Sequence, residues 1–149
     1  ARFGPLGDLY RRAAKEAAVP AADVRVSVGS MGYIGEDAEK ARRHWFQHWH
    51  AAMDAVGKLR GFSAPGWDQF EPQAKGHGAL FVGSPEEIAE RIVSFQRRRG
   101  HMRQFFQMDM GHLPQKDFLR SIELLGTKVK PLVDAELGDT TRRKERVDA

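Results

Sequence analysis

Two strand-like runs, each followed by a glycine-containing turn and an amphipathic segment, limit the fold of this chain more than any other feature. β-Branched apolar residues alternate with Arg25 and Ser27 over Val24–Val28, which predicts a strand that runs into the loop "GSMGYIGED". The run "MRQFFQMDM", residues 102–110, mixes apolar and aromatic residues without a helical stripe and lies between glycines, which favours a second strand. Strands that alternate with helices are typical of a parallel α/β fold.

Apolar residues recur at steps of three or four in four further segments, which predicts amphipathic helices. Gly126 and Pro131 weaken the middle and end of the last of them. The segment Arg60–Gly78 is rich in glycine and proline and predicts a long ordered loop or short helical pieces. The short apolar run Ala79–Val82 then leads into the third helix. The predicted helices cover residues 6–17, 37–59, 85–100 and 114–136.

The two predicted strands are too few for a complete α/β domain, so further strands or a covering partner are expected. Two strands do not make a stable parallel sheet, which normally has several strands and is covered on both faces. We therefore expect residues 1–137 to be part of a larger α/β domain, or a homo-oligomer that covers its open strand edges. The last residues, 138–149, contain the run "RRKER" and are expected to be a disordered tail.

Composition and charge exclude several classes of protein. Hydrophobic residues make up 41% of the 149 residues, which is enough for a buried core. The sequence has no cysteine, so disulfides and thiolate sites are excluded and a cytoplasmic location is expected. It shows no long apolar run and no export leader, so we expect no membrane span. The net charge is +4, and Arg97–Arg99 predict a solvated helix end rather than a nucleic-acid site, because no aromatic platform accompanies them.

The stretch "FVGSPEEIAERI", residues 81–92, resembles a phosphate-binding loop at first sight, because Gly83 and Ser84 stand where an apolar run becomes a helix. Ser84 is a predicted N-cap, Pro85 suits the first helical position, and Glu87 would complete a capping box with Ser84. Glu86 and Glu87 also place negative charge where a phosphate would lie. No GxGxxG or GK[ST] pattern is present. The stretch therefore predicts a helix start and no nucleotide site.

Two long stretches, "GALFVGSPEEIAERIVSF" and "FFQMDMGHLPQKDFLRSIELLGTKVKPLV", resemble the carboxy-terminal part of luciferase-like monooxygenases. These enzymes form the bacterial luciferase superfamily, which depends on a flavin or a deazaflavin. The family's "G-[ST]-P-E-E-[IV]-A-E-[RK]" helix and its final "L-x-x-[FL]-x-x-x-V-x-P" helix close a TIM barrel. Upstream, "LGDLYRRAAKEAAV" and "VRVSVGSMGYIGEDAEKAR" are similar to the preceding helix, strand and helix. The resemblance covers about Phe3 to Leu137.

The resemblance implies late (βα) elements of a TIM barrel, incomplete in this chain, since a full barrel has eight strands and about 250 residues. It also implies a flavin-dependent oxidoreductase that acts on a small organic substrate, by oxygen activation with reduced FMN or by hydride transfer with a deazaflavin. In the family much of the flavin site comes from earlier strands, which this chain lacks. The Arg60–Gly78 segment, with Phe62, Trp67 and Phe70, is predicted to cover part of the substrate.

The chemistry of TIM-barrel enzymes lies at the carboxy ends of the strands, so the residues that follow the two predicted strands are the candidate site. His112 is the predicted catalytic donor to a flavin ring or substrate, and Asp109 would orient it. The structural alternative is that Asp109 bonds to loop backbone and His112 caps the final helix. Tyr33 is as consistent with packing as with ligand contact. The predicted cofactor-binding residues are Ser30, Met31, Gly32, Tyr33 and Gly111.

A metal site is the rival interpretation of the run "HWFQHWH", residues 44–50. His44 and His48 are four residues apart, so they would share one helix face and could both bind zinc. Two ligands do not make a site, and Trp45 stands where an HExxH motif has glutamate. We therefore predict a polar helix face and no metal.

A second function of a different class remains open beside the flavin enzyme. The chain could be a non-catalytic half-barrel that assembles with another copy or with a missing amino-terminal half. Retention of a flavin would favour the enzyme, whereas its absence together with stable oligomerisation would favour assembly. A hydrolase has no support, because no serine lies in a GxSxG motif.

Overall fold

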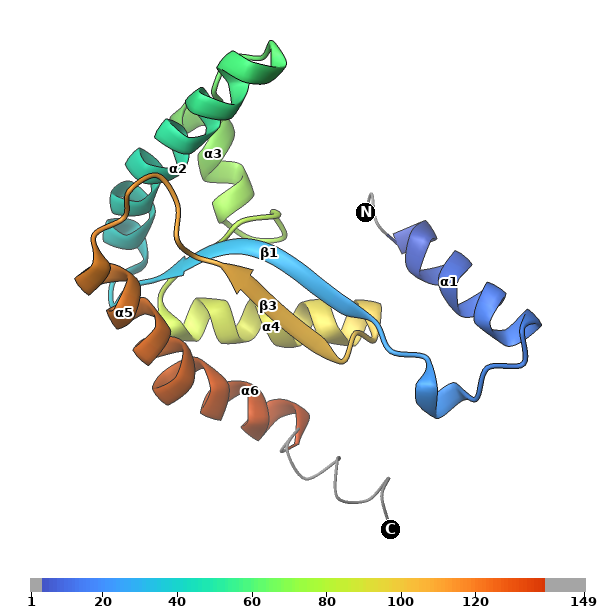
Figure 1. Ribbon diagram of the computed structural model, residues 1–149. Coiled ribbons are helices and arrows are strands. Elements are labelled where there is room, and N and C mark those ends of the chain that lie inside the picture. Colours follow the sequence, from blue (N-terminus) through green and yellow to red (C-terminus); the bar gives the residue numbers. More distant parts are fainter. Residues whose placement is uncertain (1–3, 139–149) are drawn as a thin grey trace.

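The computed structural model describes residues 4–138, and the tail predicted to be disordered lies outside them from Asp139 onward. It contains a parallel sheet of three strands in the order β2-β1-β3 (Figure 1). The strands are β1 (Ser27–Ile34), β2 (Phe81–Gly83) and β3 (Arg103–Gln107). The α/β class is therefore confirmed, whereas the prediction of two strands is wrong. β2 was missed because a strand of three residues is too short to show an alternating pattern.

The first strand is displaced from its predicted range. It begins at Ser27, and it continues through the glycine-rich stretch that was expected to be a loop. Its first half pairs with β3 from Ser27↔Arg103 to Met31↔Gln107, and its last residues pair with β2 from Gly32↔Phe81 to Ile34↔Gly83. Hydrogen bonding on these two sides makes the stretch a strand, although glycine lowers its intrinsic preference. Ser30, Met31, Gly32 and Tyr33 thus lie within β1 and not after it, which corrects the prediction.

The helices agree with the predicted segments, with ends shifted by a few residues. Within Arg60–Gly78 the structure has one short helix, α3, as the "short helical pieces" alternative expected. The elements are α1 (Gly4–Glu16), the 3₁₀ turn η1 (Ala21–Asp23), α2 (Ala38–Arg60), α3 (Trp67–Ala74), α4 (Pro85–Arg99), α5 (Gln115–Leu124), the π-helical turn η2 (Leu125–Val129) and α6 (Lys130–Leu137).

The last helix accommodates its proline through a change of helix type. The π-helical turn Leu125–Val129 lies between α5 and α6, and Pro131 falls in the first turn of α6. A proline lacks the N–H that a continuous α-helix would require there, and a local π turn is a common way to absorb such an interruption. The predicted helix over 114–136 is therefore one helical segment with a non-α middle.

Side-chain caps fix where two of the helices begin. Asp37 Oδ1 accepts from the Lys40 N–H at 2.8 Å, and Ser84 Oγ accepts from the Glu87 N–H at 3.4 Å. The Ser84 half of the predicted capping box is confirmed. The Glu87 carboxylate instead forms an ion pair with Arg42 of α2, which ties the start of α4 to α2.

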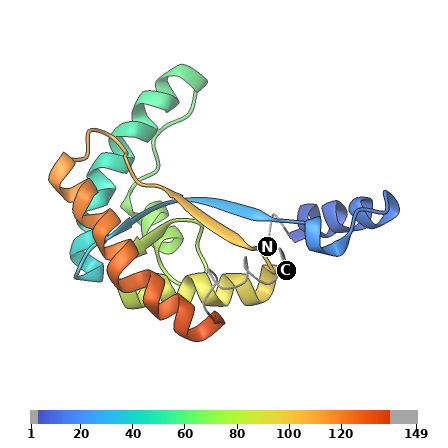
Figure 2. The same ribbon diagram turned by 60° about the horizontal axis from the view of Figure 1, so that its bottom comes forward.

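The two faces of the sheet carry separate apolar clusters, because neighbouring residues of a strand point to opposite faces. The face that packs on α4, α5 and η2, called here the covered face, is shown from two sides in Figures 1 and 2. On it the Ile34 N–H donates to the buried Ser121 Oγ at 2.8 Å, which ties α5 to β1. Its buried cluster consists of Ile34, Phe81, Ile88, Ala89, Ile92, Met108, Leu124 and Val129.

The other face, called here the open face, is covered over only part of its length. Its carboxyl half packs under α2 and α3 through Tyr33, Val82 and an aromatic group around Trp45. Its amino half is bare: Phe105 is 56% exposed, and its ring lies over Gly29, where a Cβ would overlap it. Parallel sheets are normally covered on both faces, so this exposure is unusual.

The first helix stands apart from the rest of the molecule in both views (Figures 1 and 2). The helix α1 contacts the rest of the fold through the guanidinium of Arg11, which donates to the Arg99 carbonyl at the end of α4. Its apolar side chains Leu6, Leu9 and Tyr10 are exposed. Among the described residues, no helix is both long and apolar enough to cross a membrane.

Candidate functional site

The carboxyl ends of the three strands lie at one edge of the sheet, because all three are parallel. This carboxyl edge is defined by Ile34, Gly83 and Gln107. The helices α2 and α5 begin close to it, and the loop 108–113 connects β3 to α5. Titratable side chains from α2 and α5 therefore meet there with the end of β1.

His44, Asp117 and Tyr33 form one group at this edge. His44 Nε2 of α2 lies 3.1 Å from Asp117 Oδ2 of α5, and the rings of His44 and Tyr33 have centroids 5.7 Å apart. Burial raises the pKa of Tyr33, and the negative charge of Asp117 raises it further, so the phenol keeps its proton at neutral pH. Asp117 was not predicted, since nothing in the sequence pairs it with a residue so far away along the chain.

A tight turn places the loop after β3 against α2. Gly111 and His112 both have positive φ, of 51° and 61°, and the Leu113 N–H donates to the Met110 carbonyl at 3.0 Å, as in a type I′ turn. His48 Nδ1 lies 2.9 Å from the Gly111 carbonyl oxygen, so this nitrogen carries the donated proton. A Cβ at Gly111 would overlap the His48 backbone oxygen. Gly111 is therefore required for packing against α2, and its predicted contact with a cofactor stays a prediction.

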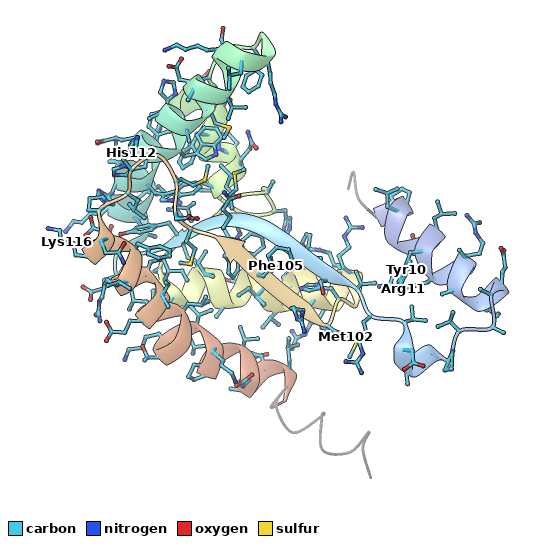
Figure 3. All side chains as sticks on the ribbon, viewed as in Figure 1. Tyr10, Arg11, Met102, Phe105, His112 and Lys116 are labelled. Atoms are coloured by element: carbon cyan, nitrogen blue, oxygen red, sulfur yellow. The ribbon has the colours of Figure 1, made fainter. Side chains whose placement is uncertain are left out.

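The two predicted catalytic residues, His112 and Asp109, both lie on this loop and are exposed. Figure 3 labels His112. Asp109 separates the buried residues Met108 and Met110, which pack into the two clusters on opposite faces. Within the described chain no ion pair joins Asp109 to His112. The alternative that His112 caps the final helix is wrong, because Pro114 is the N-cap of α5 and no side chain caps it. His112 is held in a strained backbone conformation with positive φ, and among residues 4–138 its imidazole has no hydrogen-bond or ion-pair partner.

The predicted cofactor-binding residues of β1 are divided between the two faces. Gln104 Nε2 donates to Ser30 Oγ at 3.1 Å, and Gly32 lies against Phe81 and Phe106, so both face the covered side. Met31 and Tyr33 point to the open face, where Met31 packs beside the aromatic cluster. Tyr33 is buried under α2 and α3, so of these four residues Met31 is the one that could meet a ligand on the open face.

The predicted substrate cover has a mainly structural role in the folded chain. Phe70 is fully buried, with its ring centroid 5.2 Å from that of Trp49 and 5.5 Å from that of Trp67. The ring of Phe70 is therefore unavailable to a ligand, which corrects that part of the prediction. Phe62, which follows α2, is partly exposed.

The two histidines considered as metal ligands are close but already have other partners. The ring centroids of His44 and His48 lie 5.2 Å apart, and the Gly111 carbonyl occupies Nδ1 of His48. Asp117 Oδ2 lies 3.1 Å from His44 Nε2 but without the geometry of a hydrogen bond. Within residues 4–138, no group of three or more histidine, cysteine, aspartate or glutamate side chains is arranged to hold a metal ion.

The residues at the carboxyl edge and on the open face suit the isoalloxazine ring of a flavin better than its phosphate. Met31 and Phe105 give the open face an apolar surface that an isoalloxazine ring could contact, and His112 has a free imidazole. The amino termini of the helices at this edge carry the carboxylates of Glu36, Asp37, Glu86, Glu87 and Asp117, with Asp109 in the loop. Glu36 pairs with Arg120 and Glu87 with Arg42, so it is the remaining carboxylates that disfavour a phosphate there.

No family model and no curated relative matches the sequence. Among solved structures, the chain is similar to the monooxygenase RslO1 from Streptomyces bottropensis, with a TM-score of 0.67 and 22% sequence identity. The similarity covers 87% of this chain but 37% of that one, so the chain spans little more than a third of the monooxygenase's length. At this identity the likeness concerns the fold. The protein is thus an α/β chain with three parallel strands in an open sheet that matches part of a larger monooxygenase chain.

Proposed function

We propose that this chain is the carboxy-terminal part of a flavin-dependent oxidoreductase of the luciferase-like type, acting on a small organic substrate. The observation that carries the proposal is the likeness of its open parallel sheet to part of a monooxygenase. The sequence motifs at Gly83–Arg91 and in the last helix support the same family. Enzymes with such sheets place their chemistry at the carboxyl ends of the strands, where Tyr33, His44 and His112 lie here.

When bound, FMN or a deazaflavin supplies the redox chemistry, and the protein supplies position, proton control and exclusion of water. In this proposal Met31 and Phe105 contact the ring on the open face. His112 donates a hydrogen bond from the loop, and the turn at Gly111 fixes its direction. Tyr33 stays neutral and contributes a phenol beside His44. The phosphate is bound by a part of the protein outside this chain.

The test is a titration of the purified chain with oxidised and then reduced FMN, followed by flavin fluorescence anisotropy. We expect saturable binding at micromolar concentrations. His112→Asn should weaken it by about tenfold, because one hydrogen bond is worth roughly 1 kcal/mol or slightly more. Asparagine tolerates positive φ, so the turn is preserved. His50→Asn is the control, since His50 is a histidine of α2 whose Nδ1 lies 3.0 Å from the Pro65 carbonyl and which is assigned to neither proposed site. Equal affinities of the two variants would contradict the role of His112.

The bare half of the open face favours a second candidate function, assembly as a non-catalytic half-barrel. Phe105 and the apolar side chains of α1 are exposed, and uncovered strands tend to pair with other chains (Figure 3). Assembly with a second copy or with a missing amino-terminal half would cover them. Light scattering should then show an oligomer that Phe105→Ser dissociates. A well-folded monomer that binds flavin would refute this candidate.

A further inference from the structure

A cleft of about 450 Å³ runs along α4 on the side away from α5 and lies outside the site described above. The loop Lys75–Gly78 and the start of α2 form its other wall. Phe81 and Phe95 contribute apolar surface. A volume of this size is within the range of small-molecule sites.

The cleft contains a half-buried cation, Arg91, that has no ion pair among residues 4–138. The guanidinium of Arg91 donates to the Ala74 carbonyl at 2.8 Å and to the Gly78 carbonyl at 2.9 Å, and it lies 4.6 Å from the centroid of the Phe81 ring. Burial, together with repulsion from Arg42 that outweighs the attraction of Glu87, lowers the pKa of Arg91 to about 10. A partly desolvated cation beside a second cation is stabilised by an added anion.

A second cation of α4, Arg98, points into the same cleft and also lacks a carboxylate partner in the described chain. It donates to Ser94 Oγ at 2.8 Å, and its other terminal nitrogen lies 3.2 Å from His77 Nδ1. Since Arg91, Ser94 and Arg98 are three, four and seven residues apart, they share one face of α4. Arg91 and Arg98, neither of which has an ion pair within the described residues, thus line the same wall of the cleft.

The remaining charged groups of the cleft largely neutralise one another. Glu39 and Glu87 pair with Arg42, and Lys75 pairs with Glu39 at 3.0 Å. Arg42 is 3% exposed, and its buried Nε–H has no acceptor. Lys75 also pairs with Glu71 at 2.8 Å, and Glu90 is exposed. Of the four cationic side chains that line the cleft, Arg91 and Arg98 are the two that have no ion pair among residues 4–138.

We propose that this cleft binds a phosphate group, either as the free ion or as the phosphate of a small ester whose carbon part lies against Phe95. The phosphate is held by Arg98, with His77 and Lys75 at the rim, and it compensates the charge of Arg91. The site is independent of the proposed flavin function, because it lies at the β2 edge of the sheet and includes no residue of β3 or of the loop 108–113.

The experiment follows the Nε–Hε signals of Arg42, Arg91 and Arg98 by NMR during titration with inorganic phosphate and, separately, with phenyl phosphate. Chloride at matched ionic strength is the reference. This readout is specific to the cleft, whereas bulk binding would include the basic run at 142–146. We expect saturable shifts of the cleft arginines. Tighter binding of phenyl phosphate would identify an ester as the ligand class, and equal or weaker binding would identify the free ion.

Arg98→Gln and Arg97→Gln form a matched pair of variants. The two residues are neighbours on α4, both are exposed, and each change removes one positive charge, but Arg97 pairs with Glu136 at 3.0 Å and lies outside the cleft. Arg98→Gln should weaken phosphate binding by about tenfold, and Arg97→Gln by less than about twofold, because charge-assisted hydrogen bonds are strong and surface fields are screened. Absent saturation, or equal weakening by both variants, would overturn the proposal.

Discussion

The covered and open faces of the sheet differ in how far this chain completes them. On the covered face, α4, α5 and η2 bury a continuous apolar cluster. The open face is completed only where α2 and α3 lie over its carboxyl half, and its amino half leaves Phe105 exposed. This chain therefore completes the covered face, whereas the amino half of the open face stays exposed. The candidate site lies at the boundary between the completed and the bare part of that surface.

The largest expected effect compares one side chain from each face. Ile88→Ala should reduce the free energy of unfolding by about 2–5 kcal/mol, because Ile88 is fully buried and the change leaves a cavity. Phe105→Ala should reduce it by less than about 1 kcal/mol, since more than half of the side chain is already exposed. Urea unfolding measures both. Similar losses would mean that the open face is covered in solution, which would favour assembly.

The next effect concerns the turn that closes the carboxyl half of the open face. Gly111→Ala should destabilise the fold by about 1–3 kcal/mol, because the backbone has positive φ and the new Cβ would overlap the His48 carbonyl. Gly126→Ala is the control: no atom lies near its Cβ position, and it should stabilise the helix by roughly 0.5–1 kcal/mol. Thermal unfolding of the two variants should shift in opposite directions. A shift of the same sign would contradict the account of the turn.

The smallest expected effect is a loss of stability in acid, which originates at the buried His101. Burial lowers the pKa of His101, which follows α4, although a hydrogen bond with Gln104 partly offsets this. The unfolded chain therefore takes up a proton more readily than the folded one. Stability is complete above the unfolded pKa of about 6.5 and falls as the pH drops below it, by at most about 1.4 kcal/mol per pH unit for one proton.

Urea unfolding between pH 8 and pH 5 checks this dependence. His101→Gln should flatten the curve. If the His101 variant kept the full slope, the acid sensitivity would come from another group.

Most of the secondary structure was predictable, because helical periodicity and helix caps depend on residues that are close together in the sequence. Helical periodicity located all the long helices, and the Ser84 cap was visible in its own sequence. β2 and the second half of β1 were not predictable in this way, because their strand conformation depends on pairing with each other. Glycine content alone indicated a loop where β1 continues.

The candidate site was predictable in part. Asp109 and His112 follow β3 as expected, since the end of that strand is marked by nearby glycine. The pairing of His44 with Asp117 was not foreseen, because it depends on the approach of α2 and α5. The strain at His112 likewise became visible only from its φ angle.

The most direct test of the central claim is a comparison of riboflavin and FMN binding to the chain by fluorescence anisotropy. In the Arg98→Gln variant, which weakens the separate phosphate cleft, the account predicts saturable micromolar binding of both, with affinities within about threefold of each other, because the open face meets the ring that the two flavins share. Absence of saturable binding for either flavin would contradict the claim that this chain contributes a flavin site.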